Sequence, residues 1–306
     1  MNIIFMGTSE FAVPSLKSLI NRENVIAIIT KPDAPKGRGK TLSPPPIKLN
    51  FKTHNNILQP ERIKDESFIE NIRNLKPDLI VVVAYGKILP EEILSIPKYG
   101  SINLHASLLP KYRGPAPINW AIINGEEKTG VTTIFMNEVV DSGDIILSKE
   151  VDISESDNAE TLGKRLALLG ANLLIETIEF IKSGNIKSIP QDHAFTTYAP
   201  FLKKNDGLID WNIDNRRIFN IIRGMNPWPS AFTYLNNVIL KIYEAKLSDE
   251  NGIPGEVLEV NKEDIKVATG GNSLILTDIQ MENRKRMKAK DFILGYPVKI
   301  GTILGK

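Results

Sequence analysis

The sequence predicts an α/β domain of Rossmann type that is followed by a small OB-like β-barrel domain. Two observations carry this prediction. Segments with strand and helix patterns alternate through the first two-thirds of the chain, as they do in open α/β sheets. From about Asp206 the pattern changes to short strands that are separated by hairpin turn signals. A chain of 306 residues is long enough for two domains with separate cores.

The first strand is expected at Ile3–Met6, a short apolar run that ends at the turn signal of Gly7. Apolar residues at helical spacing predict amphipathic helices at Phe11–Ile20 and Ala159–Ser183. Leu79–Ala84 is a continuous apolar run, typical of a central parallel strand that is covered on both faces. The other strands of this domain are expected at Val25–Ile29, Ser101–His105, Val131–Met136 and Ile145–Ser148.

The second domain is expected to begin with one helix, Arg216–Arg223, and to continue with short strands. Turn signals at Asn236-Asn237 and Gly270-Gly271 separate some of these strands and are typical of hairpins. The strands are expected at Ala231–Leu235, Val238–Ala245, Gly255–Val260, Ile265–Ala268 and Ser273–Ile279. The sequence therefore predicts a first domain over residues 1–189, a linker over 190–205 and a second domain over 206–306.

Composition excludes several classes of protein and site. The absence of cysteine excludes disulfides and thiolate zinc sites and is typical of a cytoplasmic protein. The three histidines are scattered and predict no metal site. The N-terminus has no basic segment before its apolar run, and no apolar run approaches the roughly 18 residues of a membrane helix, so neither a signal peptide nor a membrane partner is expected. A net charge of +2 means that any RNA-binding surface must come from local clusters.

Asn103-Leu104-His105 places an amide and an imidazole two residues apart on an expected strand, so both side chains should face the same side. The strand ends just before Ser107, at the carboxyl edge where open α/β sheets bind ligands. Asp141 lies in a separate turn, Val140-Asp141-Ser142-Gly143-Asp144, and a carboxylate beside an imidazole would orient it. Taken alone, Asn103-Leu104-His105 more often means satisfied polar residues at a strand end, and the Asp141 segment more often means an ordinary tight turn.

Together with their neighbours, these segments resemble the signature of the folate-dependent formyltransferase family. The similarity spans three runs: Ser101 to Pro117, Thr129 to Thr132 and Asp141 to Ile145. The resemblance implies that Asn103, His105 and Asp141 are the catalytic trio, that 10-formyltetrahydrofolate is the co-substrate, and that no metal is required. It also implies folate contacts from the turn formed by Ser107, Leu108, Leu109 and Pro110. By apolar context and analogy, the pterin is expected to lie against the backbone of Val83, Ala84, Tyr85 and Gly86.

The polar segment after the second strand contains Lys36-Gly37-Arg38-Gly39-Lys40-Thr41, which superficially suggests a phosphate-binding P-loop. A P-loop needs glycine where this chain has Ala34, and Pro44-Pro45-Pro46 prevents a helix from starting in the required register. An unremarkable mobile surface loop is one alternative. The segment also resembles the loop that family members acting on methionyl-tRNA insert against the acceptor end of the tRNA. That resemblance implies tRNA contacts from Lys36, Arg38 and Lys40.

Five basic residues lie among the seven positions from Arg284 to Lys290. Such a run is often only a solvated face, but near the end of a barrel domain it is a candidate for contacts with the tRNA backbone through Arg284, Lys285 and Arg286. The segment Ile222 to Pro229 is also typical of the family, and we expect a structural role for it. Met6-Gly7-Thr8-Ser9 departs from the dinucleotide fingerprint, so no dinucleotide cofactor is expected.

The function that this resemblance implies is transfer of a formyl group to the α-amino group of methionyl-initiator tRNA. Attack on the formyl carbon creates an oxyanion, to which Asn103 and protonated His105 would donate hydrogen bonds. Asp141 would orient His105 and accept the proton that leaves the amine. Two alternatives stay open: a formyltransferase that acts on a sugar-nucleotide or ribonucleotide amine, and a non-catalytic RNA-binding relative.

Overall fold

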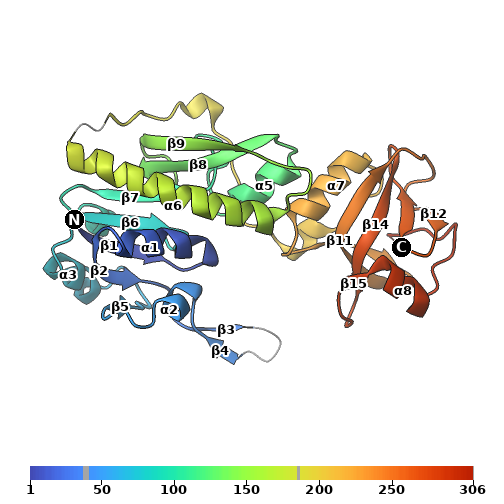
Figure 1. Cartoon of the computed structure of the whole chain (residues 1–306), viewed down its shortest axis with the longest axis horizontal. Helices are drawn as coiled ribbons and strands as arrows, with labels where there is room; N and C mark the ends of the chain where they lie inside the picture. The colour runs from blue at the N-terminus through green and yellow to red at the C-terminus, as the bar shows by residue number, and fades with distance from the viewer. Residues whose placement is uncertain (37–40, 185–186, 306) are drawn as a thin grey trace. The chain divides into compact units, whose positions relative to one another are not determined.

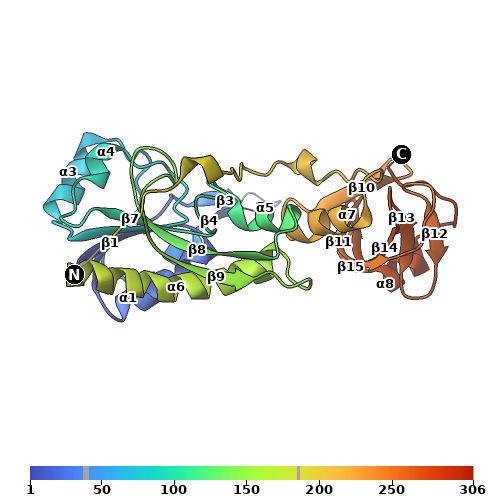
Figure 2. The same cartoon turned by 90° about the horizontal axis from the view of Figure 1, so that it is seen from above.

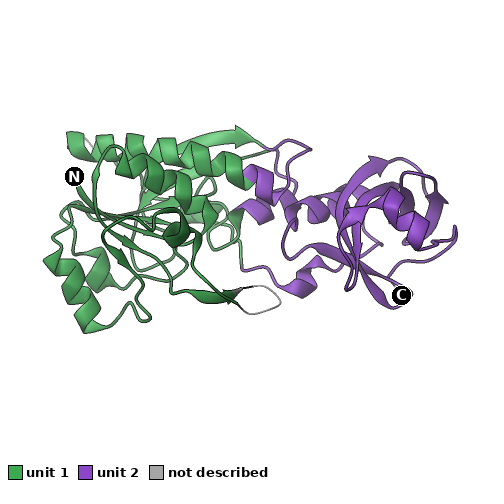
Figure 3. Cartoon of the chain, turned by 60° about the horizontal axis from the view of Figure 1, so that its bottom comes forward, with its two compact units in different colours: residues 1–117, 128–152, 163–200 green, residues 118–127, 153–162, 201–306 purple. Residues whose placement is uncertain are grey.

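The computed structural model describes residues 1–36, 41–184 and 187–305 (Figure 1). These residues form two compact units (Figure 3). Unit 1 comprises Met1–Pro117, Lys128–Asp152 and Gly163–Pro200, and unit 2 comprises Ile118–Glu127, Ile153–Leu162 and Phe201–Lys306. The expected domain boundaries at residues 189 and 206 stay a prediction.

Unit 1 is built on a seven-stranded sheet with the order β5-β2-β1-β6-β7-β8-β9. Its first five strands in this order run parallel, whereas β7 pairs with β8, and β8 with β9, in antiparallel fashion. The short connection between β8 and β9 permits only the antiparallel arrangement. The strands are β1 (Asn2–Gly7), β2 (Asn24–Ile29), β5 (Ile57–Leu58), β6 (Leu79–Val83), β7 (Ser101–His105), β8 (Lys128–Phe135) and β9 (Ile145–Asp152).

Helices cover both faces of this sheet, as the view in Figure 2 shows. α3 (Glu66–Asn74) and α4 (Glu91–Leu94) lie on one face, where Ile72 and Ile93 pack with Ile4 and Val82 of the central strands. α1 (Val13–Ile20) and α6 (Ala159–Ser183) lie on the other face. The core strand β6 is buried along its whole length, as a strand covered on both faces must be. A Rossmann-like α/β domain, as predicted, is therefore confirmed.

Several elements of unit 1 depart from the expected ones. The helix expected from Phe11 begins as a 3-10 turn, Glu10–Ala12, and becomes α-helical only at Val13, next to Pro14 in its first turn. The polar segment after β2 is not only a loop, since β3 (Ala34–Lys36) and β4 (Thr41–Ser43) pair as an antiparallel hairpin. Elements of unit 1 without an expected counterpart are β5, α2 (Pro46–Asn50), α3 and α4, most of them too short for a strong periodic signal. The short helix α5 (Pro117–Ile123), which falls almost wholly in unit 2, also has no expected counterpart.

Unit 2 combines α7 (Asn215–Gly224) with a six-stranded antiparallel sheet, so the all-β character expected for the second domain is confirmed. The sheet follows the order β10-β11-β14-β13-β12, and β15 pairs with β14. Its core includes Trp211, Ile218 and Phe292, and the Trp211 indole donates to Thr233 Oγ1 at 2.9 Å. The elements are β10 (Ala231–Leu235), β11 (Val238–Ser248), β12 (Val257–Val260), β13 (Ile265–Ala268), β14 (Ser273–Met281), β15 (Met287–Lys288) and α8 (Ala289–Gly295). The OB-like form of this sheet stays a prediction.

Candidate active site

The three polar residues expected to act together lie side by side at the carboxyl end of β7. Asn103 and His105 come from the strand itself, while Asp141 comes from the loop between β8 and β9. Asn103 Nδ2 donates to Asp141 Oδ1 at 3.3 Å, and His105 Nδ1 lies 3.6 Å from Asp141 Oδ2. The structure therefore brings an amide and an imidazole from one strand together with a carboxylate that lies 38 residues after Asn103 in the chain.

The Asp141 carboxylate is held from two sides. Besides the Asn103 amide, the backbone N–H of Gly114 donates to Oδ2 at 2.8 Å. The backbone of Asp141 has a φ of 53°, a left-handed conformation that is uncommon for a residue with a Cβ. Only 12% of its side chain is exposed. The carboxylate is therefore fixed in position, yet one edge of it stays accessible.

His105 has an oxygen neighbour at each ring nitrogen. Nε2 lies 2.9 Å from the carbonyl oxygen of Tyr112, and because a carbonyl only accepts, Nε2 carries the hydrogen and donates. The 3.6 Å separation of Nδ1 from Asp141 exceeds hydrogen-bond length. With its single hydrogen on Nε2, neutral His105 can donate directly to a substrate oxygen only if its ring leaves Tyr112, whereas protonated His105 also carries a hydrogen on Nδ1. The expected donation from His105 therefore requires either protonation or a movement of the ring, and donation from Asn103 requires neither.

The Asn103 amide carries two hydrogens, and Asp141 is its one acceptor among the described residues. Its other N–H is free to donate to an incoming oxygen, next to a carboxylate that can accept a proton. An amide donor beside a carboxylate is suited to acyl transfer, in which an oxyanion forms while an amine loses its proton.

Folate contacts were expected from the turn after β7. Several polar groups of this turn already form hydrogen bonds within the protein. The Ser107 hydroxyl donates to the Lys111 carbonyl at 2.6 Å, and Thr132 Oγ1 bridges the turn by donating to Ser107 O and accepting from the N–H of Leu109. Ser107 and Leu109 are buried, whereas Leu108 and Pro110 are partly exposed. Apolar contact with a ligand is therefore available mainly from Leu108 and Pro110.

The end of β6, the second expected folate segment, exposes backbone more than side chains. Val83 and Tyr85 are buried, while Ala84 and Gly86 are exposed and have positive φ values of 45° and 74°. The Tyr85 hydroxyl has no hydrogen-bond partner among the described residues, and burial raises the pKa of Tyr85 to about 12. A flat ring could lie against the Ala84–Gly86 backbone, but the Tyr85 ring belongs to the core beneath it.

The ammonium group of Lys31 lies beside the Ala84–Gly86 segment, and no motif in the sequence singles Lys31 out. Lys31, just after β2, brings its ammonium so close to Gly86 that a Cβ at position 86 would lie 2.5 Å from Nζ. Burial, followed by the neighbouring Lys87 charge, lowers the pKa of Lys31. Lys87 donates to the carbonyl oxygens of Pro60 and Glu61, whereas no acceptor for Lys31 Nζ is found within residues 1–36, 41–184 and 187–305.

Of the residues expected to contact tRNA near the N-terminus, Lys36 ends β3, and its side chain lies outside the described part of the structure. Arg38 and Lys40 also lie outside the described residues. The start of the hairpin is held by Asp33, which accepts from Lys48 Nζ at 2.9 Å and from Gln59 Nε2 at 2.7 Å. These hydrogen bonds, with that from Gln59 the larger cause, lower the pKa of Asp33.

The basic run Arg284–Lys290 has two kinds of side chain. Arg286 and Lys288 are paired with Asp278 at 2.7 Å and 3.0 Å, and both also contact Glu244. The Arg286 guanidinium lies 4.3 Å from the Tyr243 ring centroid. The described residues provide no ion pair for Arg284, Lys285 or Lys290. The charge available to an external anion is therefore smaller than the sequence indicates, and it resides on Arg284, Lys285 and Lys290.

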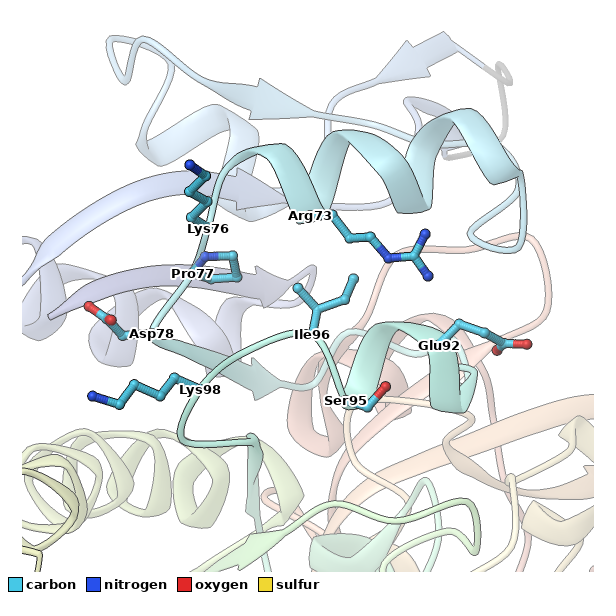
Figure 4. Close-up of a pocket in the computed structure, with 8 residues that line it drawn as sticks. All are labelled: Arg73, Lys76, Pro77, Asp78, Glu92, Ser95, Ile96 and Lys98. Carbon is cyan, nitrogen blue, oxygen red and sulfur yellow. The ribbon is translucent and has the colours of Figure 1, made fainter.

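One hollow on unit 1 lies away from these residues. It has a volume of about 530 Å³ and is lined by residues of α3 and α4 and of the segments that lead into β6 and β7, among them Arg73, Asp78 and Lys98 (Figure 4). It is at the amino end of β6, whereas Tyr85 and Gly86 follow the carboxyl end of the same strand. None of the expected site residues lines it.

Neither a metal-binding group nor a membrane span is found in the described part of the chain. No three histidine, aspartate or glutamate side chains of the described residues are grouped so as to hold a metal ion. Within the same residues, every helix is too short or too polar to cross a membrane.

Comparison with known proteins gives a consistent result over the whole chain. A family model described as formyl transferase matches residues 1–178, and a model of a formyl transferase C-terminal domain matches residues 202–297. Methionyl-tRNA formyltransferase of Geotalea uraniireducens is 48% identical over all of this chain and 98% of that protein. The enzyme of the same name from Clostridioides difficile is 47% identical over 100% of both chains.

Solved structures with the same fold are more distant in sequence. An N-formyltransferase of Helicobacter canadensis, in complex with folinic acid and dTDP-3-aminofucose, aligns with a TM-score of 0.69 at 20% identity, over 92% of this chain and 99% of that one. HypX of Aquifex aeolicus, in complex with tetrahydrofolic acid, aligns with a TM-score of 0.68 at 19% identity, over 99% of this chain and 49% of that one. At this identity the likeness concerns the fold.

Proposed function

The chain belongs to the formyl transferase family, and from this premise we propose that it transfers a formyl group from 10-formyltetrahydrofolate to the α-amino group of methionyl-initiator tRNA. The observation that carries the proposal is the 46–48% identity, over the whole chain, to relatives named methionyl-tRNA formyltransferase. Because that identity includes the second domain as well as the first, it favours a tRNA acceptor over a small amine. We place the reaction in the cytoplasm.

The chemistry joins the amine nitrogen of methionine to the formyl carbon and breaks the bond from that carbon to N10 of the folate. Asn103 donates its free N–H to the oxygen that becomes negative in the tetrahedral intermediate. Asp141 accepts the proton that leaves the amine, directly or through a water, and its negative charge lies 3.6 Å from His105 Nδ1. The amine proton finally replaces the formyl group on N10, so that no proton is left over.

His105 has two possible contributions in this scheme. In the described arrangement its Nε2–H holds the Tyr112 carbonyl, which fixes the turn that follows β7. A protonated His105 also carries a hydrogen on Nδ1 and becomes a second donor to the oxyanion. Catalytic hydrogen bonds often tighten only when substrate is bound, and the Nδ1–Asp141 distance of 3.6 Å leaves room for such a change.

The folate is proposed to lie between the exposed backbone of Ala84–Gly86 and the apolar side chains of Leu108 and Pro110. Two groups are proposed to hold the tRNA. The first consists of Lys36, Arg38 and Lys40 near the acceptor end, and the second of Arg284 and Lys285 on unit 2, with Arg286 largely committed to Asp278. Cations that touch phosphate position a nucleic acid without reading its sequence.

The direct test is a transfer assay with 10-formyltetrahydrofolate and a series of acceptors. We expect rapid transfer to methionyl-initiator tRNA, slow transfer to methionyl-elongator tRNA and no transfer to a nucleotide-linked amino sugar. Faster transfer to the amino sugar would favour a small-amine formyltransferase instead. Tight tRNA binding without any transfer, although the folate binds, would identify a non-catalytic RNA-binding relative.

A further inference from the structure

A buried polar pair, Arg113 and Gln191, lies directly behind the Asp141 loop. Their exposed fractions are 5% and 6%, although both are polar and one is charged. Gln191 belongs to the segment 190–205, which the sequence predicts to be a linker. Buried polar side chains are costly unless their hydrogen bonds are made, so both residues need partners.

Gln191 uses its whole amide. Its Nε2 donates one hydrogen to the Asp141 carbonyl at 2.9 Å and the other to the Gly143 carbonyl at 2.7 Å. Its Oε1 accepts from Arg113 through Nε at 3.1 Å and Nη2 at 2.6 Å. Because a guanidinium only donates, the amide oxygen must face Arg113, and the amide nitrogen must therefore face the loop. Arg113 thus fixes which end of Gln191 meets Asp141.

Apolar packing contributes little to holding this loop, which depends on hydrogen bonds. The two apolar side chains before Asp141 point outward, with Val139 64% and Val140 49% exposed. Asp141 has the left-handed φ of 53°, which is unfavourable for a residue with a Cβ. At Gly143 a Cβ would lie only 1.7 Å from the Phe135 carbonyl oxygen, so the backbone there is closed tightly against the end of β8. The two hydrogen bonds from Gln191 span this strained turn.

The segment Arg113–Gly114 also holds the side-chain carboxylate of Asp141. The N–H of Gly114, the residue after Arg113, donates to the carboxylate at 2.8 Å. Two backbone hydrogen bonds fix Arg113 in turn: its N–H donates to the Thr197 carbonyl at 2.9 Å, and its carbonyl accepts from the Ala199 N–H at 2.7 Å. The Asp141 carboxylate and the Asp141 backbone are therefore tied to one frame, which consists of residues 113–114 and 191–199.

We propose that Gln191, oriented by Arg113, is a positioning residue that sets the place of the Asp141 carboxylate relative to Asn103 and His105. The inference rests on the proposed function and deepens it, since it assigns part of the expected linker to the catalytic site. Gln191 acts through Asp141 and touches no substrate. A misplacement of about 1 Å in a reacting group can cost about 10²-fold in rate.

The sharpest variant is Gln191→Glu, which keeps the size of the side chain and an oxygen for Arg113 but removes both donors to the loop. We expect kcat for formyl transfer to fall about 10²-fold, while KM for the folate changes less than about threefold, because the loss is in the geometry of the trio. Gln191→Ala, which also removes the donors but leaves space for water, should give a loss of the same order.

Asn215→Asp is the matched control in unit 2. Asn215 is buried, and its amide nitrogen likewise donates to two carbonyl oxygens, those of Ser248 at 3.1 Å and Ser273 at 3.0 Å. This variant should lose a similar amount of thermal stability but keep kcat. If it lost kcat as strongly as Gln191→Glu at the same fall in Tm, the effect of Gln191 would be one of stability only, and the proposal would be overturned.

A second measurement does not depend on turnover. If Gln191 positions Asp141, then Gln191→Glu and Gln191→Ala should speed hydrogen exchange at the Gly114 amide, which donates to that carboxylate, at least about tenfold. An unchanged Gly114 exchange rate together with a kcat within about threefold of wild type would contradict the inference. Absence of formyl transfer by the wild-type enzyme would contradict the proposed function instead, and Gly114 exchange would still decide the positioning role.

Discussion

The Asn103–His105–Asp141 cluster in unit 1 and the basic run Arg284–Lys290 in unit 2 both stand out in the sequence, and the structure uses them in opposite ways. The first cluster is formed from distant segments, and each of its polar groups keeps a defined partner together with some access. The second is continuous in the chain, yet Arg286 and Lys288 are taken up by Asp278 and Glu244 from neighbouring strands.

The difference shows that a continuous run of charges in the sequence overstates the charge available for binding, whereas polar residues that are dispersed in the sequence can form a site once the chain folds. Charges that are adjacent in sequence can be neutralised by whatever strand pairs next to them, and here β11 and β14 supply the acids. The dispersed set has no function until the chain folds, but once assembled it is held by hydrogen bonds that leave one amide N–H free. Three experiments would break or sharpen this comparison.

The largest effect is expected from the trio itself. Asn103→Ala and His105→Ala should each lower kcat about 10²–10³-fold, the usual loss for one oxyanion donor. Asp141→Asn keeps the shape and removes the charge, so it should also impair turnover severely. Folate binding, measured separately by fluorescence or calorimetry, should change much less. Near-normal kcat in any two of the three folded variants would mean that this cluster is only a satisfied strand end.

A smaller effect is expected from the basic run. Residues of the run without an ion pair should contribute to tRNA binding, whereas those in ion pairs should contribute to stability. Replacing Arg284 and Lys285 together by Ala should weaken binding of initiator and elongator tRNA by similar factors, about tenfold, because phosphate contacts do not read sequence. The slope of log affinity against log salt should become shallower by about one unit per lost contact. The measurement is tRNA affinity over a salt series for the double variant and the wild type.

Arg286→Ala is the comparison variant for this experiment. Removing Arg286 leaves the nearly buried Asp278 with Lys288 as its remaining cation, so we expect a loss of about 1 kcal/mol in stability and little change in the salt slope. Equal slopes and affinities for wild type and the Arg284/Lys285 variant would show that the run is only a solvated face. A full unit of slope lost in Arg286→Ala would show that its ion pairs open for tRNA.

The smallest effect concerns Lys31 in unit 1, which has no acidic partner among the described residues and so contrasts with the paired Arg286. Because burial lowers the pKa of Lys31 in the folded state, the unfolded chain binds more protons over the pH range between the folded and unfolded values, and stability rises with pH there. Lys31→Met should therefore raise Tm at pH 7 by roughly 1 °C, a small change because the side chain is partly exposed. That gain should shrink as pH approaches 10.5.

Lys17→Met is the control for this measurement, since Lys17 is an exposed lysine on α1 of the same unit. Thermal unfolding of wild type and both variants between pH 7 and pH 10 gives the comparison. A gain for Lys31→Met that grows toward high pH, or an equal gain for Lys17→Met, would contradict an energetic cost of the Lys31 ammonium.

Much of the fold follows from local sequence patterns, namely apolar runs and the spacing of apolar residues. The buried strand β6 is evident from five consecutive apolar residues, and α6 from apolar spacing sustained over 25 residues. The short elements α4 and β5 offer too few residues for a period to emerge, and their existence depends on packing against the sheet. The direction of β8 and β9 is likewise a property of the pairing, not of the strand pattern.

By itself the sequence determined the order of the two domains, the family and the residue types of the trio, because these depend on composition, periodicity and motif. Only the tertiary structure decided which polar groups meet: that Asp141 reaches Asn103, that Asp278 takes up Arg286, and that Gln191 belongs to the site. The physical reason is that hydrogen bonds and ion pairs act over about 3 Å, whereas their partners here come from segments up to 50 residues apart.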